Sequence, residues 1–188
     1  VGGVVVRRAA PHTYEELERK GVRLGDSVFI QRAGEVIPEI VSVIVDARNG
    51  EEVWVHIPEK CPSCGTPLTQ DDGKVAIYCP NTSTCPAQTS GALKAFASKH
   101  AANIDGLGEK MVDIFLERGF LTDFPSMYRL HTYRDAILAL EGFEDKKTDN
   151  LLMAIEATRT MELARFLLAL GIPEVGRKTA KTLAVYIA

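Results

Sequence analysis

The sequence feature that most restricts how this chain can fold is its set of four cysteines. They are the only cysteines in 188 residues: Cys61, Cys64, Cys79 and Cys85. They form a C-x2-C pair and a C-x5-C pair, and such pairs can bring four thiolates to one point, the ligand set that a tetrahedral Zn²⁺ prefers. Because four protein ligands leave no open position, the spacing predicts a structural zinc rather than a catalytic one.

Two other interpretations of the cysteines are open, namely two disulfides or four unrelated buried thiols. The sequence shows no recognisable secretory signal, and disulfides are rare in proteins that stay in a reducing compartment. A structural zinc is therefore the favoured interpretation.

Composition and charge restrict the function classes. No apolar stretch approaches the roughly 20 residues of a membrane span, so no membrane association is expected. The formal net charge is −3, which argues against a protein that binds nucleic acid through a general positive field. Any DNA contact must come from locally placed cations and backbone amides. The chain starts at Val1 rather than Met, which indicates a piece of a longer protein.

Residues 1–57 are predicted to form a small β-barrel that is incomplete at its N-terminus. β-branched runs predict strands over residues 4–6, 27–31, 36–45 and 53–57, with a turn at Gly25-Asp26. A short helix is expected over residues 13–19, with Thr13 as its cap and Glu16 at the capping-box position.

The remaining residues are predicted to form two further domains, giving a multi-domain α+β fold. Residues 58–88 hold the four cysteines and five prolines, so they are expected to be a zinc module with few regular elements and a fold that depends on the metal. Residues 89–188 are expected to be all-α and C-terminally incomplete. Apolar residues recur at helical spacing in 151–155, 163–170 and 180–187.

An internal repeat lies in the helical part. Its copies span residues 104–110, 140–146 and 172–178, and they start 36 and 32 residues apart. Each has an apolar anchor, a tight turn around a central apolar residue and a new helix with a lysine at the same place. This pattern is the helix-hairpin-helix motif, and the fixed order of its features over three copies supports it over ordinary helix-ending turns.

The motif predicts phosphate binding at the start of each second helix. Glycine lets the backbone approach a phosphate closely, and free N–H groups and the helix dipole favour an anion there. The candidate contacts in the three copies are the following glycines and lysines: Gly106, Gly108 and Lys110; Gly142 and Lys146; Gly176 and Lys178. Such contacts hold the sugar-phosphate backbone without reading base sequence.

The three copies are unequal. Only the first has both glycines, whereas Glu144 replaces the later glycine of the second copy and Glu174 replaces the earlier glycine of the third. A carboxylate repels a phosphate. We therefore expect Gly106, Gly108 and Lys110 to form the best site, with the other two copies binding weakly or serving packing.

The order of barrel, zinc module and hairpin array resembles the C-terminal part of bacterial NAD-dependent DNA ligases. Residues 25–38 are similar to the oligonucleotide-binding (OB) fold signature of that family, residues 79–88 to its zinc signature, and residues 104–110 and 175–180 to its hairpins. The resemblance implies an OB-fold domain over residues 1–57, a four-cysteine zinc finger over 58–88 and a helix-hairpin-helix domain over 89–188.

The resemblance also implies a function. Members of this family seal nicks in duplex DNA in replication and repair, using NAD, Mg²⁺ and a lysine in a Lys-x-Asp-Gly motif that becomes adenylated. That motif is absent from these 188 residues, so the intact protein is expected to be an enzyme and this part non-catalytic. Nicked double-stranded DNA is the expected partner, and a monomer in the bacterial cytoplasm, associated with the nucleoid, is the expected state. Arg32 falls within the barrel signature and is an expected DNA contact; a solvated turn charge is the alternative.

Two other function classes are open. A stand-alone helix-hairpin-helix factor of repair or recombination would bind DNA junctions or flaps. A zinc-stabilised scaffold for protein interactions would fit the acidic net charge and would have no DNA affinity.

Overall fold

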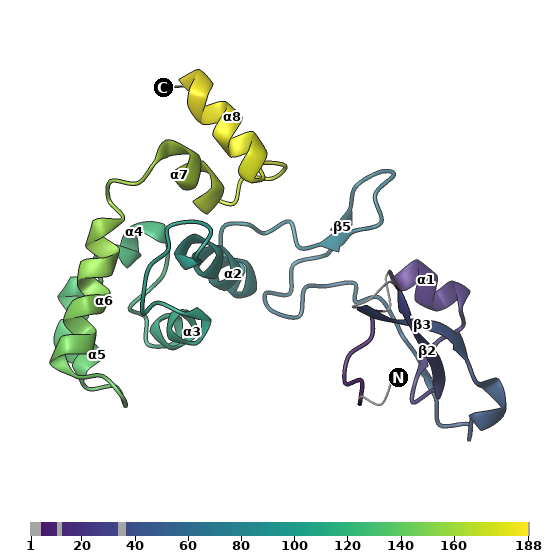
Figure 1. The fold of residues 1–188 in the computed structure, drawn as a ribbon. Coiled ribbons are helices and arrows are strands. Elements are labelled where there is room, and N and C mark those ends of the chain that lie inside the picture. Colours follow the sequence, from purple (N-terminus) through teal and green to yellow (C-terminus); the bar gives the residue numbers. More distant parts are fainter. Residues whose placement is uncertain (1–4, 11–12, 34–36, 188) are drawn as a thin grey trace. The chain divides into compact units, whose positions relative to one another are not determined.

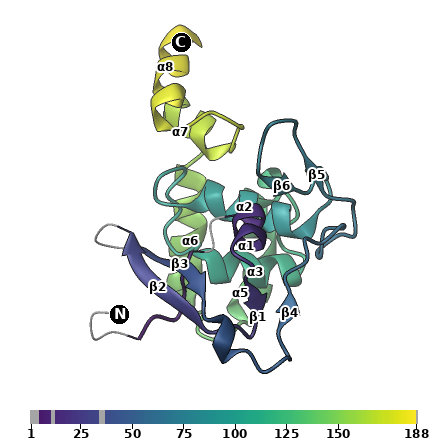
Figure 2. The same ribbon diagram turned by 90° about the vertical axis from the view of Figure 1, so that its right-hand side faces the viewer.

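The computed structural model describes residues 5–10, 13–33 and 37–187. Two compact units divide the chain, residues 1–80 and residues 81–188. The first unit contains short strands with one α-helix, and the second contains helices (Figures 1 and 2). The predicted mixture of a β-rich part and an all-α part is confirmed.

The first unit is built around an antiparallel pair of strands. β2 (Val28–Ala33) pairs with β3 (Ile37–Val43), with a shift of register between Phe29 and Ile30 (Figure 1). A second antiparallel pair joins β1 (Arg23–Leu24) to β4 (Val53–Trp54), and the 3₁₀ turn η1 (Val45–Ala47) follows β3. The sequence pattern missed β1, which has only two residues.

The helix α1 (Tyr14–Arg19) begins where the sequence predicts it. Thr13 has an extended backbone, and its side-chain oxygen accepts a hydrogen bond from the N–H of Glu16 at 3.2 Å. The Glu16 carboxylate pairs with Arg19 and Lys20. The capping interaction by Thr13 is therefore confirmed, while the Glu16 side chain serves the last turn of the helix rather than its start.

Two of the predicted strands differ from the structure. Val5 and Val6 are not in a strand, and Val4 lies outside the described residues. The strand predicted over 53–57 ends at Trp54. A β-branched run favours extended backbone, but it forms a strand only where another strand offers hydrogen bonds. In the described part of the N-terminal segment the one recorded pairing is a bridge from Ala10 to Glu39.

The loops that carry the first three cysteines contain little regular structure. A two-residue pair joins β5 (Thr69–Gln70) to β6 (Ile77–Tyr78). This agrees with the prediction that a proline-rich metal module forms few long elements.

The second unit contains seven α-helices and one 3₁₀ turn among its described residues. Their bounds are α2 (Pro86–Ala97), α3 (Glu109–Glu117), α4 (Phe124–Met127), η2 (Leu130–Tyr133), α5 (Arg134–Leu138), α6 (Asp145–Ala157), α7 (Leu163–Ala169) and α8 (Arg177–Ile187). Within this unit α2 packs on α3, α5 on α6 and α7 on α8 (Figures 1 and 2). The helices predicted from residues 151–155, 163–170 and 180–187 are confirmed.

A continuous apolar core holds the second unit together. Its buried members come from α2, α3, α4, η2, α5, α6 and α7 and from the turns between them; the largest are Leu93, Phe96, Phe115, Leu121, Met127, Leu130, Ile137 and Leu151. Across the described ranges, none of the helices has the length and apolar character needed to cross a bilayer.

Candidate functional site

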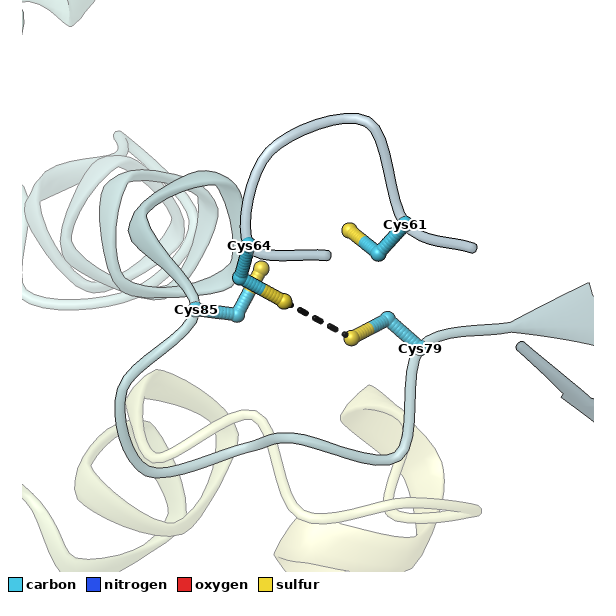
Figure 3. Close-up of side chains that lie close together, drawn as sticks. All are labelled: Cys61, Cys64, Cys79 and Cys85. Carbon is cyan, nitrogen blue, oxygen red and sulfur yellow. Dashed lines mark hydrogen bonds between the residues drawn. The ribbon is translucent and has the colours of Figure 1, made fainter. Parts of the chain in front are cut away.

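The four cysteines converge as their spacing predicts. Their sulfur atoms all lie within 4.8 Å of one another, and the side chains point toward a common centre (Figure 3). Cys61 and Cys85 are buried, and none of the four cysteines forms a disulfide bond. The two alternative interpretations of the cysteines, disulfides and scattered thiols, are therefore wrong.

The geometry of this cluster fits a tetrahedral metal ion. Zinc–sulfur bonds of about 2.3 Å place tetrahedral ligand sulfurs about 3.8 Å apart. The Sγ atoms of Cys64 and Cys79 are 3.5 Å apart, and the other separations stay below the 4.8 Å limit. Four soft donors without a fifth position suit a structural Zn²⁺ and leave no site for a substrate.

A tight turn holds the first pair of cysteines, and we call residues 61–65 the zinc knuckle. Gly65 has a φ of +73°, which side chains rarely allow, and its N–H donates to the carbonyl of Cys61 at 2.8 Å. Cys85 is fully buried and immediately precedes α2, so its position is fixed by the helix that begins at Pro86.

Hydrogen bonding prepares one thiol for a metal. The Sγ of Cys64 and the Oγ1 of Thr66 are hydrogen-bonded at 3.2 Å. This side-chain bond and a further bond from the Thr66 backbone lower the pKa of Cys64 to about 6. Since the thiolate is the form that binds metal, the loop favours the ligand state at neutral pH.

The three copies of the repeat fold into the same backbone corner. We call them corner 1 (residues 104–108), corner 2 (residues 140–144) and corner 3 (residues 172–176). Their second turn residues, Gly106, Gly142 and Glu174, have φ values of +81°, +76° and +64°. In each corner the N–H of the central apolar residue donates to the carbonyl of the anchor, at 3.3 Å in corner 1, 3.1 Å in corner 2 and 3.0 Å in corner 3.

Corner 1 presents backbone donors to solvent. Leu107 is buried and plugs the corner from inside, while Gly106, Gly108 and Lys110 are exposed. Gly108 is the cap of α3 and has no side-chain oxygen to satisfy the first N–H groups of that helix. Among the described residues, no acceptor is recorded for the N–H groups of Gly108, Glu109 and Lys110. These three groups and the helix dipole are what an anion requires.

One glycine of corner 1 differs from the expectation. The N–H of Gly106 donates to the Asp105 carboxylate at 3.1 Å. Gly106 therefore supplies the left-handed turn, and the available N–H donors are those of the next residues but one, Gly108, Glu109 and Lys110. The backbone amide of Glu109 is a candidate that the glycine and lysine pattern did not single out.

Corner 2 has the same backbone, but a lysine of this chain already bonds to one of its carbonyls. The Nζ of Lys147 donates to the carbonyl of Gly142 at 2.7 Å and lies 4.4 Å from the centre of the Phe143 ring. Lys146 and Gly142 are exposed. The sequence pattern missed Lys147, although the doublet Lys146-Lys147 was a visible signal.

Carboxylates at the start of α6 further distinguish corner 2. Glu144 caps α6 without a side-chain capping bond. Arg134 pairs with Asp145 at 2.7 Å and with Asp149 at 2.9 Å, and the latter bond keeps the pKa of Asp149 below its usual range. The start of α6 therefore carries two consecutive carboxylates, Glu144 and Asp145, where the start of α3 carries Gly108 and Glu109.

Corner 3 places a glutamate in the left-handed region. Glu174 has a φ of +64°, a conformation that costs a residue with a Cβ about 1–2 kcal/mol. Gly176 and Lys178 are exposed at the start of α8. Val175, the plug of this corner, is only half-buried, so corner 3 packs less tightly than the other two.

Corners 1 and 2 share a hollow within the helical unit. Its volume is about 330 Å³, and it is lined by Asp105 and Gly106 of the first corner and by residues 144, 146, 147, 150 and 151 around the second. A Cβ built on Gly106 would lie 3.6 Å from Leu151, which shows how closely the corner packs on α6. The structure thus brings the candidate residues of two copies together.

One predicted site residue cannot be placed. Arg32 lies in β2 with its backbone opposite Pro38, and its side chain lies outside the described part of the chain. Its proposed DNA contact stays a prediction.

Comparison with known proteins assigns two segments to families. Residues 1–52 match the NAD-dependent DNA ligase OB-fold domain, and residues 60–87 match the NAD-dependent DNA ligase C4 zinc finger domain. The second match contains all four cysteines. The OB-fold domain and the structural zinc site, both predicted from the sequence, are confirmed.

Relatives extend the likeness over nearly the whole chain. Proteins named DNA ligase from Thermomicrobium roseum and Salinibacter ruber are each 45% identical to it over 184 residues, which is 98% of this chain and 26% of each relative. A DNA ligase of Thermodesulfovibrio yellowstonii is 44% identical over 98% of this chain and 27% of its own length. The chain therefore spans about a quarter of the length of these relatives. The resemblance found in the sequence is confirmed.

Proposed function

Because residues 1–52 and 60–87 are domains of the NAD-dependent DNA ligase type, we propose that this chain is the DNA-binding part of such a ligase. It grips the backbone of nicked double-stranded DNA without reading the base sequence. The observation that carries this proposal is the backbone conformation shared by three corners, each of which opens directly into a new helix.

Each part of corner 1 has a physical role in the proposed contact. Gly106 makes the left-handed turn, and buried Leu107 anchors that turn to the core. The amides of Gly108, Glu109 and Lys110 then face an incoming phosphate oxygen, with the dipole of α3 adding to the attraction. The ammonium group of Lys110 supplies the positive charge.

The other corners contribute less in this proposal. At corner 2 Lys147 is already bonded to Gly142, so Lys146 is the cation left to meet a phosphate, and Glu144 opposes it. At corner 3 Gly176 and Lys178 make the contact, again beside a glutamate. Corner 1 is thus the main phosphate site, and corners 2 and 3 help to fix the position of the chain along the DNA backbone.

The intact protein, on this proposal, is an NAD-dependent DNA ligase that seals nicks in replication and repair. The present residues carry an OB-fold domain (1–57), the zinc finger (58–88) and the helix-hairpin-helix domain (89–188), with Arg32 as a barrel contact. NAD and Mg²⁺ serve catalysis by groups outside these 188 residues, which contain no Lys-x-Asp-Gly. The protein acts as a monomer on nucleoid DNA in the bacterial cytoplasm.

A salt titration tests the grip on DNA. Binding of the zinc-loaded chain to nicked duplex is measured by fluorescence anisotropy over a series of salt concentrations. The logarithm of affinity should fall linearly with the logarithm of salt, with a slope of about −0.9 per neutralised phosphate. Lys110→Gln should weaken binding and make the slope shallower by about one phosphate.

Matched variants separate the proposed site from general charge effects. Lys74→Gln removes the same charge at a lysine that pairs with Asp71, and it should leave the slope unchanged. No affinity for DNA at low salt would favour the scaffold interpretation. A strong preference for junctions or flaps over a nick would favour a stand-alone repair factor.

A further inference from the structure

A second candidate site lies in the helical unit, where an aromatic groove is formed by two adjoining hollows. The hollows have volumes of about 550 and 570 Å³ and share Tyr128, Arg159 and Phe166. Volumes of this size are typical of small-ligand sites. Arg159 follows the last turn of α6, whereas corner 2 precedes the first turn of that 13-residue helix, so about 20 Å of helix separates the two.

Aromatic rings form the body of this groove. Phe96 is buried beneath it, with its ring centre 5.1 Å from that of Phe124 and edge-on to Tyr128 at 6.4 Å. Phe166, on α7, is 41% exposed and faces both hollows. The fixed rings below and the exposed ring above offer flat apolar surface to a planar ligand.

Two arginines and a histidine line the rim of the groove. Arg129, His131 and Arg159 face it, and the described residues that line the two hollows include no aspartate or glutamate. Outside the lining, Arg159 pairs with Glu156, and Arg129 lies 3.6 Å from Asp123; all four side chains stay largely exposed, so a phosphate can reach the guanidinium groups. The guanidinium carbon of Arg159 lies 5.0 Å from the centre of the Tyr128 ring, and its Nη2 donates to the Tyr128 carbonyl at 3.4 Å. The arginine therefore lies over the Tyr128 ring as a cation–π partner and places positive charge beside the aromatic surface.

We propose that this groove binds one unstacked nucleotide of single-stranded DNA, with the base against Phe166 and Tyr128 and the phosphate at Arg129 and Arg159. The aromatic faces suit a planar ligand and the exposed guanidinium groups suit an anionic one, and a nucleotide has both properties in one unit. Aromatic rings beside arginines are the usual platform for single-stranded nucleic acid.

An acidic peptide suits the groove less well. It would bring backbone N–H and C=O groups that need partners, and unsatisfied polar groups are costly to bury. The two hydroxyl groups of the lining, those of Tyr128 and Thr158, are already hydrogen-bonded to each other at 3.0 Å. The face of a base needs no such partner.

The test measures single-strand binding by the whole zinc-loaded chain. The probe is a fluorescein-labelled oligothymidylate about 12 nucleotides long, within the site sizes usual for such platforms. Phe166→Ala should weaken its binding by about 5- to 150-fold, the range expected for the loss of one stacked base. Phe166→Leu, which keeps apolar volume, should lose nearly as much, and Phe166→Trp should retain binding. Unchanged thermal unfolding and zinc content in Phe166→Leu show that the fold is intact.

Two variants distinguish single-strand binding at this groove from the proposed binding of nicked duplex. Phe166→Leu should leave the affinity for nicked duplex unchanged, while Lys110→Gln should lower the duplex affinity and spare the oligothymidylate. Equal oligothymidylate binding by Phe166→Leu and the parent chain would overturn the nucleotide site, as would loss of that binding only in Lys110→Gln. Tighter binding of a labelled acidic peptide than of the oligothymidylate, abolished by Phe166→Ala, would assign the groove to a protein partner and also overturn it.

Discussion

The zinc knuckle and corner 1 are both tight turns around a glycine, yet different forces hold them in place. Gly65 and Gly106 have similar φ values, +73° and +81°. The knuckle points its sulfurs inward to a metal, whereas corner 1 points Leu107 inward to the core and its later amides outward.

The difference shows what each turn can do. A turn stabilised by a metal has its polar atoms committed to that metal and is structural. A turn stabilised by a buried apolar side chain leaves its polar atoms available for a ligand. The following predictions test this contrast by removing the metal, the plug, the glycine geometry and an ion pair in turn.

Removing the metal should have the largest effect. Cys61→Ser should lose zinc and disorder residues 58–88, because structural zinc supplies about 10–16 kcal/mol of apparent binding energy in small zinc-dependent folds. The helices that form corner 1 should persist, since their core is apolar. Elemental analysis measures the zinc content, and amide hydrogen exchange measures which residues become disordered. Ser83→Ala, in the loop between Cys79 and Cys85, is the control that should keep zinc; one zinc per chain in Cys61→Ser would refute the ligand set.

Removing the plug should come next. Leu107 is buried in the core, so Leu107→Ala should lower the free energy of unfolding of the helical unit by about 2–5 kcal/mol. The zinc content should stay at one per chain. Chemical denaturation followed by circular dichroism gives the measurement. Val175→Ala in corner 3 is the matched comparison and should cost less, because Val175 is only half-buried; an equal or larger loss there would contradict the assignment of Leu107 as the tighter plug.

Changing the left-handed turn residues should have opposite effects in two corners. Glu174→Gly should stabilise the chain by about 1 kcal/mol, since it relieves a residue held at positive φ. Gly106→Ala should destabilise it by about 1–2 kcal/mol for the same reason. Gly91→Ala, inside α2 at a position where an added Cβ would meet only open space, should instead stabilise by about 1 kcal/mol. Thermal unfolding of the three variants distinguishes these signs, and a stabilising Gly106→Ala would show that corner 1 does not need its glycine.

A third kind of turn, at Gly25-Asp26, is held by an ion pair and should show the smallest effect. Arg48 donates to both Asp26 oxygens, at 2.7 and 2.8 Å, and the N–H of Arg23 donates to the same carboxylate at 2.7 Å. The bond from Arg48 is the main cause that lowers the pKa of Asp26 to about 2. The folded state therefore favours the ionised carboxylate, whose usual pKa is about 3.9.

The pH dependence follows from that difference. The stabilisation is fully present above about pH 5 and is lost as pH falls through the unfolded pKa toward the folded value of about 2. Asp26→Asn should lower the unfolding midpoint at pH 6, and the gap between the two proteins should narrow as pH falls from 5 to 2. Comparing the two proteins at each pH cancels acid effects common to both, such as release of zinc. A gap that does not change with pH would show that the ion pair contributes nothing.

The sequence by itself determined the features that depend on spacing along the chain. Two cysteine pairs predicted the zinc site, and three repeated corners with their helices were visible as a period, because a turn or a helix is set by residues a few positions apart. The same local information was insufficient for strands: Val5 and Val6 had the composition of a strand, and the structure gives them none. A strand requires a partner from elsewhere in the chain.

Only the tertiary structure decided how equivalent motifs came to differ. Lys147 bonds to the carbonyl of Gly142, and corners 1 and 2 meet over one hollow. Four aromatic side chains, from α2, α7 and the two ends of α4, gather with Arg159 into a groove. These arrangements join residues tens of positions apart, and their energies come from packing, desolvation and ion pairing. Such terms depend on which side chains meet in space, so no local pattern in the sequence could state them.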